Sequence, residues 1–316
     1  MKIYNKIIAL FAIGIAMASC GVDISEEDYT PASKESDGLQ AAYFTGSSYS
    51  RTVEVEPGSA SFDITIGRLN TSSTANVGIT VVNDENGIFD VPSTVSFAAG
   101  ESTATLTINA PRAAEGVNYP LTIAIADADK SLYTNGYREV NIDFAILKWD
   151  NIGTGYLLDG TIGTFWGVDS SIPLAVDIQH TTTATGERFR FYSPFAHVAT
   201  ATDGIGYVGY PYNEEGDCDE ADHLMVINIT EKGAVLNPLA IGMDWGYGSI
   251  SIGSQAYGNY DKDNGVIVFP ANALYICMTD YNAGKHYDCG TPTYVYLSAE
   301  SYLKSLGGDE EGEEEE

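Results

Sequence analysis

Hydrophobic and polar residues alternate with a period of two through residues 38–147, in short runs separated by turn residues. The alternating apolar positions are Val53 and Val55; Phe62, Ile64 and Ile66; Val77, Ile79 and Val81; Val95 and Phe97; Leu106 and Ile108; Leu121, Ile123 and Ile125; and Val140, Ile142, Phe144 and Ile146. This period indicates strands with one buried face. Turn dipeptides such as Pro57-Gly58 and Asn86-Gly87 separate the runs. Seven or eight short strands in roughly 110 residues predict an immunoglobulin-like sandwich for residues 38–147.

The amino-acid composition changes near Trp149, after which glycine and tyrosine become frequent. Apolar runs of strand length occur at 174–178, 188–192, 224–229, 249–252, 266–269, 274–278 and 294–297. They predict a C-terminal antiparallel β domain over residues 148–306, built as a barrel or a sandwich. Residues 298–306 predict one short closing helix with Ser298 as its N-cap. The chain is therefore predicted to be all-β with two domains.

The first residues predict an export signal and a lipid anchor. Lys2 and Lys6 precede an apolar run over 7–17 that is too short to span a bilayer, so residues 1–19 are expected to be a signal peptide. Cys20 directly follows small residues, which is the pattern of a lipobox and predicts lipidation of Cys20. Residues 20–37 are polar and mostly acidic, and are expected to form a flexible tether.

Net charge excludes some classes of partner. The formal charge is −29, which argues against nucleic acid and against contact with anionic lipid through protein charge. We therefore expect membrane attachment through the lipid anchor only. Residues 307–316 are almost wholly acidic and are expected to be a disordered tail.

Several segments resemble known families. Residues 95–108 and 115–123 resemble the middle of a Calx-beta domain, and such domains stand as spacers at the N-terminus of Bacteroidetes surface lipoproteins. Residues 25–28, a serine and three acids soon after Cys20, resemble the signal that sends such lipoproteins to the outer face of the outer membrane. Residues 165–168, 207–217 and 242–248 resemble a C-terminal β domain of the same lipoproteins. The resemblance implies an outer-membrane lipid-anchored protein facing the cell exterior, and carries no activity with it.

Aromatic residues in glycine-rich loops are the candidate ligand-binding groups. They are Trp166, Tyr207, Tyr210, Tyr212, Trp245 and Tyr247, with the carboxylate of Asp244 beside them. Exposed rings stack on the apolar face of a sugar, and a carboxylate accepts its hydroxyls. The same residues also fit a packing role at the ends of a sheet. The sequence therefore predicts a non-enzymatic surface protein that binds glycan, with a protein-binding or adhesion module of an outer-membrane complex as the alternative.

Signatures of catalysis and of metal binding are weak. The sequence has no Gly-x-Ser-x-Gly elbow, no phosphate-binding glycine loop and no His-Glu-x-x-His motif. Its four histidines lack zinc-site spacing, and the acids at Asp127, Asp129 and 261–265 are as typical of turns as of calcium sites. We expect no enzyme activity, no cofactor and no metal. A pair of carboxylates for glycoside hydrolysis stays open until their separation is known.

Three cysteines remain after Cys20, and an oxidising exterior favours one disulfide among them. A turn at 282–285 would place Cys277 and Cys289 nearly opposite each other in a hairpin, which makes them the favoured pair. Cys218 is the competing partner, and the absence of any bridge is the remaining alternative.

Overall fold

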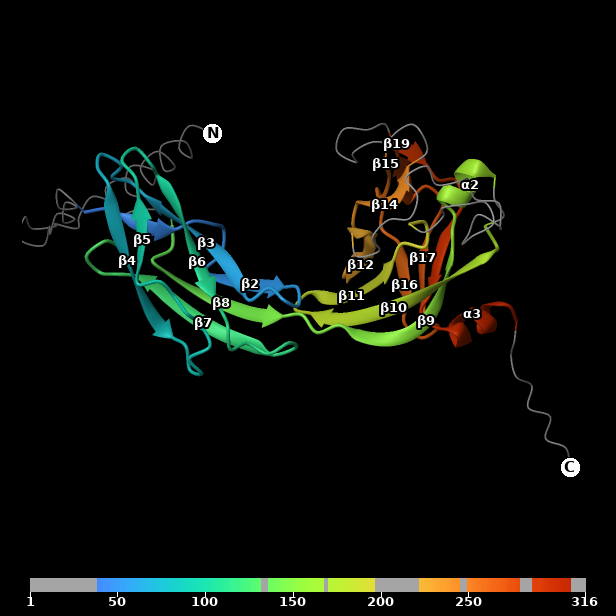
Figure 1. The fold of residues 1–316 in the computed structure, drawn as a ribbon, viewed down its shortest axis with the longest axis horizontal. Coiled ribbons are helices and arrows are strands. Elements are labelled where there is room, and N and C mark those ends of the chain that lie inside the picture. The colour runs from blue at the N-terminus through green and yellow to red at the C-terminus, as the bar shows by residue number, and fades with distance from the viewer. Residues whose placement is uncertain are drawn as a thin grey trace, which may run out of the picture.

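The structure is a computed structural model that describes residues 39–131, 136–167, 170–196, 222–244, 249–278 and 286–307. It is all-β, as the sequence predicts. Strands β1 to β8 pair only among themselves in the described residues, and so do β9 to β20. The two groups of strands form separate halves of the molecule, which follow each other end to end along its long axis (Figure 1).

The first domain is a sandwich of a three-stranded and a five-stranded sheet. Its strands are β1 (Ala42–Phe44), β2 (Ser50–Val55), β3 (Ser61–Arg68), β4 (Ala75–Asn83), β5 (Thr94–Phe97), β6 (Thr103–Asn109), β7 (Asn118–Ile125) and β8 (Glu139–Ile146). The strand orders are β1-β3-β6 and β2-β8-β7-β4-β5. All pairs are antiparallel except β2 with β8, which is parallel. This is the predicted immunoglobulin-like architecture.

The alternating residues of the first domain form its core. Phe62, Phe89 and Phe144 pack ring against ring between the sheets, with centroids 5.1–6.3 Å apart. Arg68 is also buried, and its guanidinium donates to the carbonyls of Ala98 and Glu101 at 2.7 and 2.9 Å. The charge is thus accommodated by backbone oxygens, because a buried polar group must keep its hydrogen bonds.

The second domain is built around an eight-stranded sheet. Its strands are β9 (Asp150–Leu158), β10 (Pro173–Thr183), β11 (Gly186–Tyr192), β12 (Leu224–Thr230), β13 (Gly233–Leu236), β16 (Asn259–Asp261), β17 (Val266–Phe269) and β20 (Thr293–Tyr296). The order is β13-β12-β11-β10-β9-β20-β17-β16.

The two edges of this sheet meet. Ala234 of β13 and Gly258, just before β16, exchange backbone hydrogen bonds of 2.9 and 2.8 Å, so the sheet curls into a barrel-like form. Glycine permits the contact, since a Cβ on Gly233 would stand 2.3 Å from the Gly258 carbonyl oxygen. Closing the edges removes unpaired strands that would otherwise be exposed.

A four-stranded sheet covers the core of this domain. It consists of β14 (Leu239–Asp244), β15 (Ser249–Ser254), β18 (Leu274–Cys277) and β19 (His286–Asp288), in the order β14-β15-β18-β19. Its inward residues, such as Met243 and Ile252, share one hydrophobic cluster with Phe189 and Phe191 of the larger sheet.

Two short helices occur in the described part of the second domain. Helix α2 (Ile162–Trp166) begins where the buried Asp159 carboxylate accepts hydrogen bonds from the backbone of Thr161 and Gly163 at 2.7 Å. Helix α3 (Ala299–Ser305) has Ser298 as N-cap with a reciprocal capping box, so the predicted closing helix is confirmed. No helix in the described residues is long and apolar enough to cross a membrane.

The cysteine hairpin has a different register from the one predicted. Cys277 on β18 pairs with His286 on β19, and Cys289 lies three residues further along. The two cysteines are therefore not opposite each other, and both are buried thiols in the structure. The prediction centred the turn too far along the chain, because turn chemistry alone does not fix strand register.

Candidate ligand-binding site

The outer face of the eight-stranded sheet carries a polar row near the first domain. On β11, Phe189 and Phe191 point into the core, so Arg188 and Arg190 point outward. Cross-strand pairing extends this outer row from Arg188 to Asn228 on β12 and to Val235 on β13. The row ends beside the turns that connect β10 to β11 and β12 to β13.

A groove of about 760 Å³ lies over this row, and we call it the outer groove. It has the size usual for small-ligand sites. Its lining residues are Thr183, Ala184, Thr185, Glu187, Arg188, Asn228, Ile229, Thr230, Glu231, Lys232, Val235 and Tyr257.

The outer groove combines an exposed ring with neutral polar groups. Tyr257 is 49% exposed, and Thr183, Thr185, Thr230 and Asn228 supply hydroxyls and an amide. The hydroxyls of Thr183 and Thr230 donate to the carbonyls of Gly186 and Gly233 at 3.2 and 3.0 Å, which orients them. A flat ring beside oriented hydroxyl and amide groups suits a ligand with one apolar face and many hydroxyls.

Two of the four charged residues that line the outer groove, Glu187 and Arg188, are held in ion pairs. Glu187 accepts from Lys262 Nζ at 2.6 Å and lies 3.1 Å from His180 Nε2. The hydrogen bond from Lys262 lowers the pKa of the Glu187 carboxyl, with a smaller contribution from His180. Lys262 in turn has its pKa raised by Glu187. The other two, Glu231 and Lys232, carry opposite charges in the β12–β13 turn, so the lining as a whole has no formal net charge.

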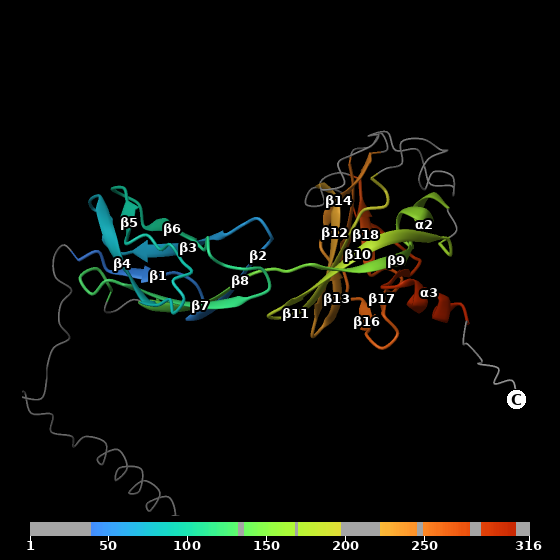
Figure 2. The ribbon, with the colours of Figure 1, turned by 60° about the horizontal axis from the view of Figure 1, so that its bottom comes forward.

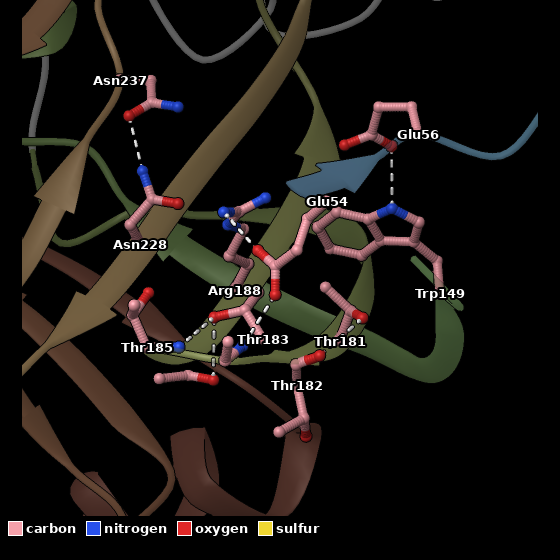
Figure 3. Close-up of polar contacts among 12 residues, drawn as sticks. Glu54, Glu56, Trp149, Thr181, Thr182, Thr183, Thr185, Arg188, Asn228 and Asn237 are labelled. Atoms are coloured by element: carbon pink, nitrogen blue, oxygen red, sulfur yellow. Dashed lines mark hydrogen bonds and ion pairs between the residues drawn. The ribbon is translucent and has the colours of Figure 1, made fainter. Parts of the chain in front are cut away.

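Contacts from the first domain hold one end of the groove (Figure 3). Glu54 of β2 accepts from the Ala184 backbone N–H at 2.7 Å and from Arg188 at 3.1 Å. Its side chain is only 13% exposed, so solvent screens this ion pair less than an exposed one. The first domain therefore fixes the β10–β11 turn.

A second carboxylate from the first domain, that of Glu56, also contacts the second domain and its linker. Glu56 accepts from Trp149 Nε1 and from Arg190, each at 2.9 Å. The Arg190 guanidinium also lies 3.9 Å above the Trp149 ring, which is a cation–π contact. Glu54, Glu56, Trp149, Arg188 and Arg190 together form what we call the junction clamp.

A second groove, of about 320 Å³, lies between the two domains, and we call it the junction groove. Its lining residues are Thr52, Glu54, Gly116, Val117, Asn118, Ala145, Ile146, Leu147, Lys148, Asp150, Thr181, Thr182 and Ala184. Both domains thus contribute to its walls, and Ala184 lines both grooves.

Most of the sequence-predicted site lies outside the described residues. This holds for Cys20, Tyr207, Tyr210, Tyr212, Trp245 and Tyr247, and for the side chains of Trp166 and Asp244. The backbone of Trp166 ends helix α2, and Asp244 ends β14, paired with Ser249 of β15. The ligand-binding role of these aromatic residues therefore stays a prediction.

The segment predicted as a loop at 242–248 begins as a strand. Gly242 lies within β14 at an irregularity of the pairing with β15, and has a φ of +74°. An added Cβ would stand 2.7 Å from the His223 ring. Met243, next to it, is fully buried. This glycine serves backbone geometry and close packing.

The acids considered for calcium act in turns. Asp129 accepts from the backbone N–H of Gly78 at 2.8 Å, and Asp127 pairs with Lys130 at 2.6 Å. Asp261 accepts from both the backbone and the side chain of Asn264, and the side-chain hydrogen bond is the main cause of its lowered pKa. Within the described ranges, no three His, Cys, Asp or Glu side chains lie close enough to hold a metal ion.

Comparisons with known proteins give only distant likenesses. The sequence matches no protein-family model and no curated protein. The structure is similar to a protein of unknown function from Bacteroides ovatus, at 13% identity and a TM-score of 0.30 over 81% of this chain and 92% of the other. It is similar to an auxiliary nutrient binding protein from Bacteroides thetaiotaomicron, at 8% identity and a TM-score of 0.27 over 78% and 89% of the chains.

A third likeness concerns a shorter stretch. CBD12 from CALX1.2 is 11% identical with a TM-score of 0.26, over 48% of this chain and 78% of the other. TM-scores this low leave the function to be argued from the site itself.

Proposed function

We propose that this protein is a non-enzymatic, cell-surface binding protein and that the outer groove of its second domain binds glycan. The observation that carries the proposal is the half-exposed ring of Tyr257 in one groove with Asn228 and three threonines. A pyranose presents an apolar face to such a ring and hydroxyls to such polar groups.

The electrostatics of the groove agree with a neutral ligand. Arg188 is engaged by Glu54, and Glu187 by Lys262. Removing a sugar's hydroxyls from water is costly unless the site returns hydrogen bonds, and the groove offers them from neutral groups.

The proposal is tested with a panel of linear glucans, mannans and xylans together with mucin glycans. Tyr257→Ala is expected to weaken binding of each glycan that binds by roughly tenfold, since truncating a central aromatic contact commonly costs more than 1 kcal/mol. Tyr192→Ala is the matched control, because Tyr192 is 44% exposed and lies outside the groove. Equal affinity for both variants, or no bound glycan at all, would reject the proposal.

The alternative function, a protein-binding module, is favoured by one feature of helix α3. Leu303 and Leu306 are 59% and 65% exposed and lie three residues apart. One exposed leucine in a helix and another directly after it suit a protein partner, for example another component of an outer-membrane complex. The panel decides between the two functions, because a protein-binding module has no need to retain a glycan through Tyr257.

We further propose that the mature protein is lipidated at Cys20 and anchored in the outer membrane with its domains facing the exterior. The lipobox and the acids that follow it support this. Cys20→Ser is expected to abolish labelling by radioactive palmitate and to release the protein from membranes. Retention of the serine variant on membranes after salt and carbonate washing would contradict the anchor.

A further inference from the structure

The outer groove and the junction groove are separated by a thin wall. That wall is the β10–β11 turn, and Ala184 at its tip lines both grooves. Glu54 lines the junction groove and bonds Arg188, which lines the outer groove. The two hollows are therefore neighbouring parts of one surface that passes from the second domain onto the first.

The chemistry of the junction groove matches that of the outer groove. Val117 presents an apolar face that is 43% exposed, and Thr52, Asn118 and Thr182 add neutral hydroxyl and amide groups. The charges of Lys148 and Asp150 at its border satisfy each other at 2.9 Å. Both grooves thus suit the same repeating unit, with one apolar face and several hydroxyls.

The junction clamp keeps the two grooves at a fixed separation. The chain between β8 and β9 is three residues long, and the carboxylates of Glu54 and Glu56 make four polar contacts with the second domain or its linker. A surface that is already ordered needs little further ordering when one ligand covers both parts.

We infer that one glycan chain occupies both grooves by crossing the β10–β11 turn. The ligand class is then an oligosaccharide or polysaccharide of several rings, and the first domain contributes directly to recognition. The inference rests on the proposed glycan-binding function. Units held in the junction groove bind at the high effective concentration set by units already held in the outer groove.

The experiment uses the full chain and each glucan, mannan, xylan or mucin glycan that the panel retains. Each retained glycan is also tested as a ladder of fragments from the disaccharide upwards. Native protein is expected to bind long fragments at least about tenfold more tightly than the shortest ones that bind. The double variant Val117→Ala, Asn118→Ala is expected to lose most of that gain while keeping the affinity for short fragments.

A second variant blocks the junction groove. Asn118→Trp places a large ring at an exposed position of its wall, and it should abolish the length dependence. Val82→Ala is the matched control, since Val82 is 54% exposed and lies outside both grooves. Thermal melts of all variants show that the fold is retained.

Three outcomes are distinguishable. Loss of the length dependence in both junction-groove variants, with short fragments unaffected, is the expected result. Unchanged binding of long fragments by these variants, while Tyr257→Ala still weakens binding, would confine the ligand to the outer groove and overturn only this inference. If the native protein binds no glycan of the panel, the proposed function is overturned, and this inference with it.

Discussion

Cys289 is a buried thiol whose ionisation is coupled to folding. Burial, with smaller contributions from Asp159 and Asp288, raises the pKa of this thiol from 9.0 to about 12. The folded protein therefore holds this proton at a pH where the unfolded chain releases it. Stability from this source is fully present below pH 9 and is lost as the pH rises towards about 12.

This predicts a pH-dependent difference between the native protein and Cys289→Ala. The native protein is expected to lose thermal stability more steeply than the variant between pH 9 and about 12. Melting temperatures of both proteins, measured across that range, isolate the contribution of the thiol from that of the other titrating groups. Parallel curves for the two proteins would show that the thiol titrates alike in both states.

Single residues of the outer groove could not be selected from the sequence. Tyr257 follows β15 and precedes Gly258, yet tyrosine beside glycine recurs throughout this half of the chain. Alternation predicts which face of a strand is buried, but which exposed residues gather depends on strand order and register. The same limit explains the cysteine prediction, where the register placed His286, and not Cys289, opposite Cys277.

Most elements were within reach of the sequence, because period two is a local signal. The predicted strand at 266–269 matches β17, and the strand predicted at 224–229 matches β12 to within one residue. Helix α2 was missed, since it is five residues long and its start depends on the buried carboxylate of Asp159. Such a short element has no amphipathic repeat to reveal it.

The junction clamp does leave a trace in the sequence. Glu54 and Glu56 are two residues apart near the end of one strand, and Arg188 and Arg190 are two residues apart on another. On strands, this spacing places each pair on one face, so the two pairs can meet as a ladder of opposite charges. The spacing shows that the two pairs have complementary charges. Whether the pairs come into contact depends on the angle between the domains.

The clamp is predicted to stiffen the connection between the domains. Glu54→Ala removes the acceptor of both the Ala184 N–H and Arg188, which is expected to destabilise this contact by about 1–3 kcal/mol. Small-angle X-ray scattering should show a broader range of domain arrangements, and proteases should cut residues 147–149 faster. Asp63→Ala is the control, because it removes an exposed carboxylate of β3 that bonds only Thr107 among the contacts described. Identical scattering and proteolysis for both variants would contradict the role of Glu54.

At the scale of the whole molecule, the two domains have separate cores joined by a polar contact. One cluster of buried residues extends from Ala42 to Ile146, and the other begins at Leu157. Figure 2 shows how narrow the connection is where β8 leads into β9. The change in composition near Trp149 predicted that the second domain begins at residue 148. No local signal in the sequence indicated that the junction between the domains forms a groove.

Separate cores lead to the final prediction, that residues 38–147 fold as an independent unit. The fragment keeps both sheets of the sandwich and the packed rings of Phe62, Phe89 and Phe144. Among the contacts of the described residues, the fragment loses the partners of Glu54 and Glu56, whose carboxylates then return to water at little cost. We expect a single cooperative unfolding transition in urea, followed both by circular dichroism and by tyrosine fluorescence. A gradual transition, or different transitions from the two probes, would mean that the domains share stabilising contacts across the junction. The boundary near Leu147 would then not mark the end of an independently folding unit.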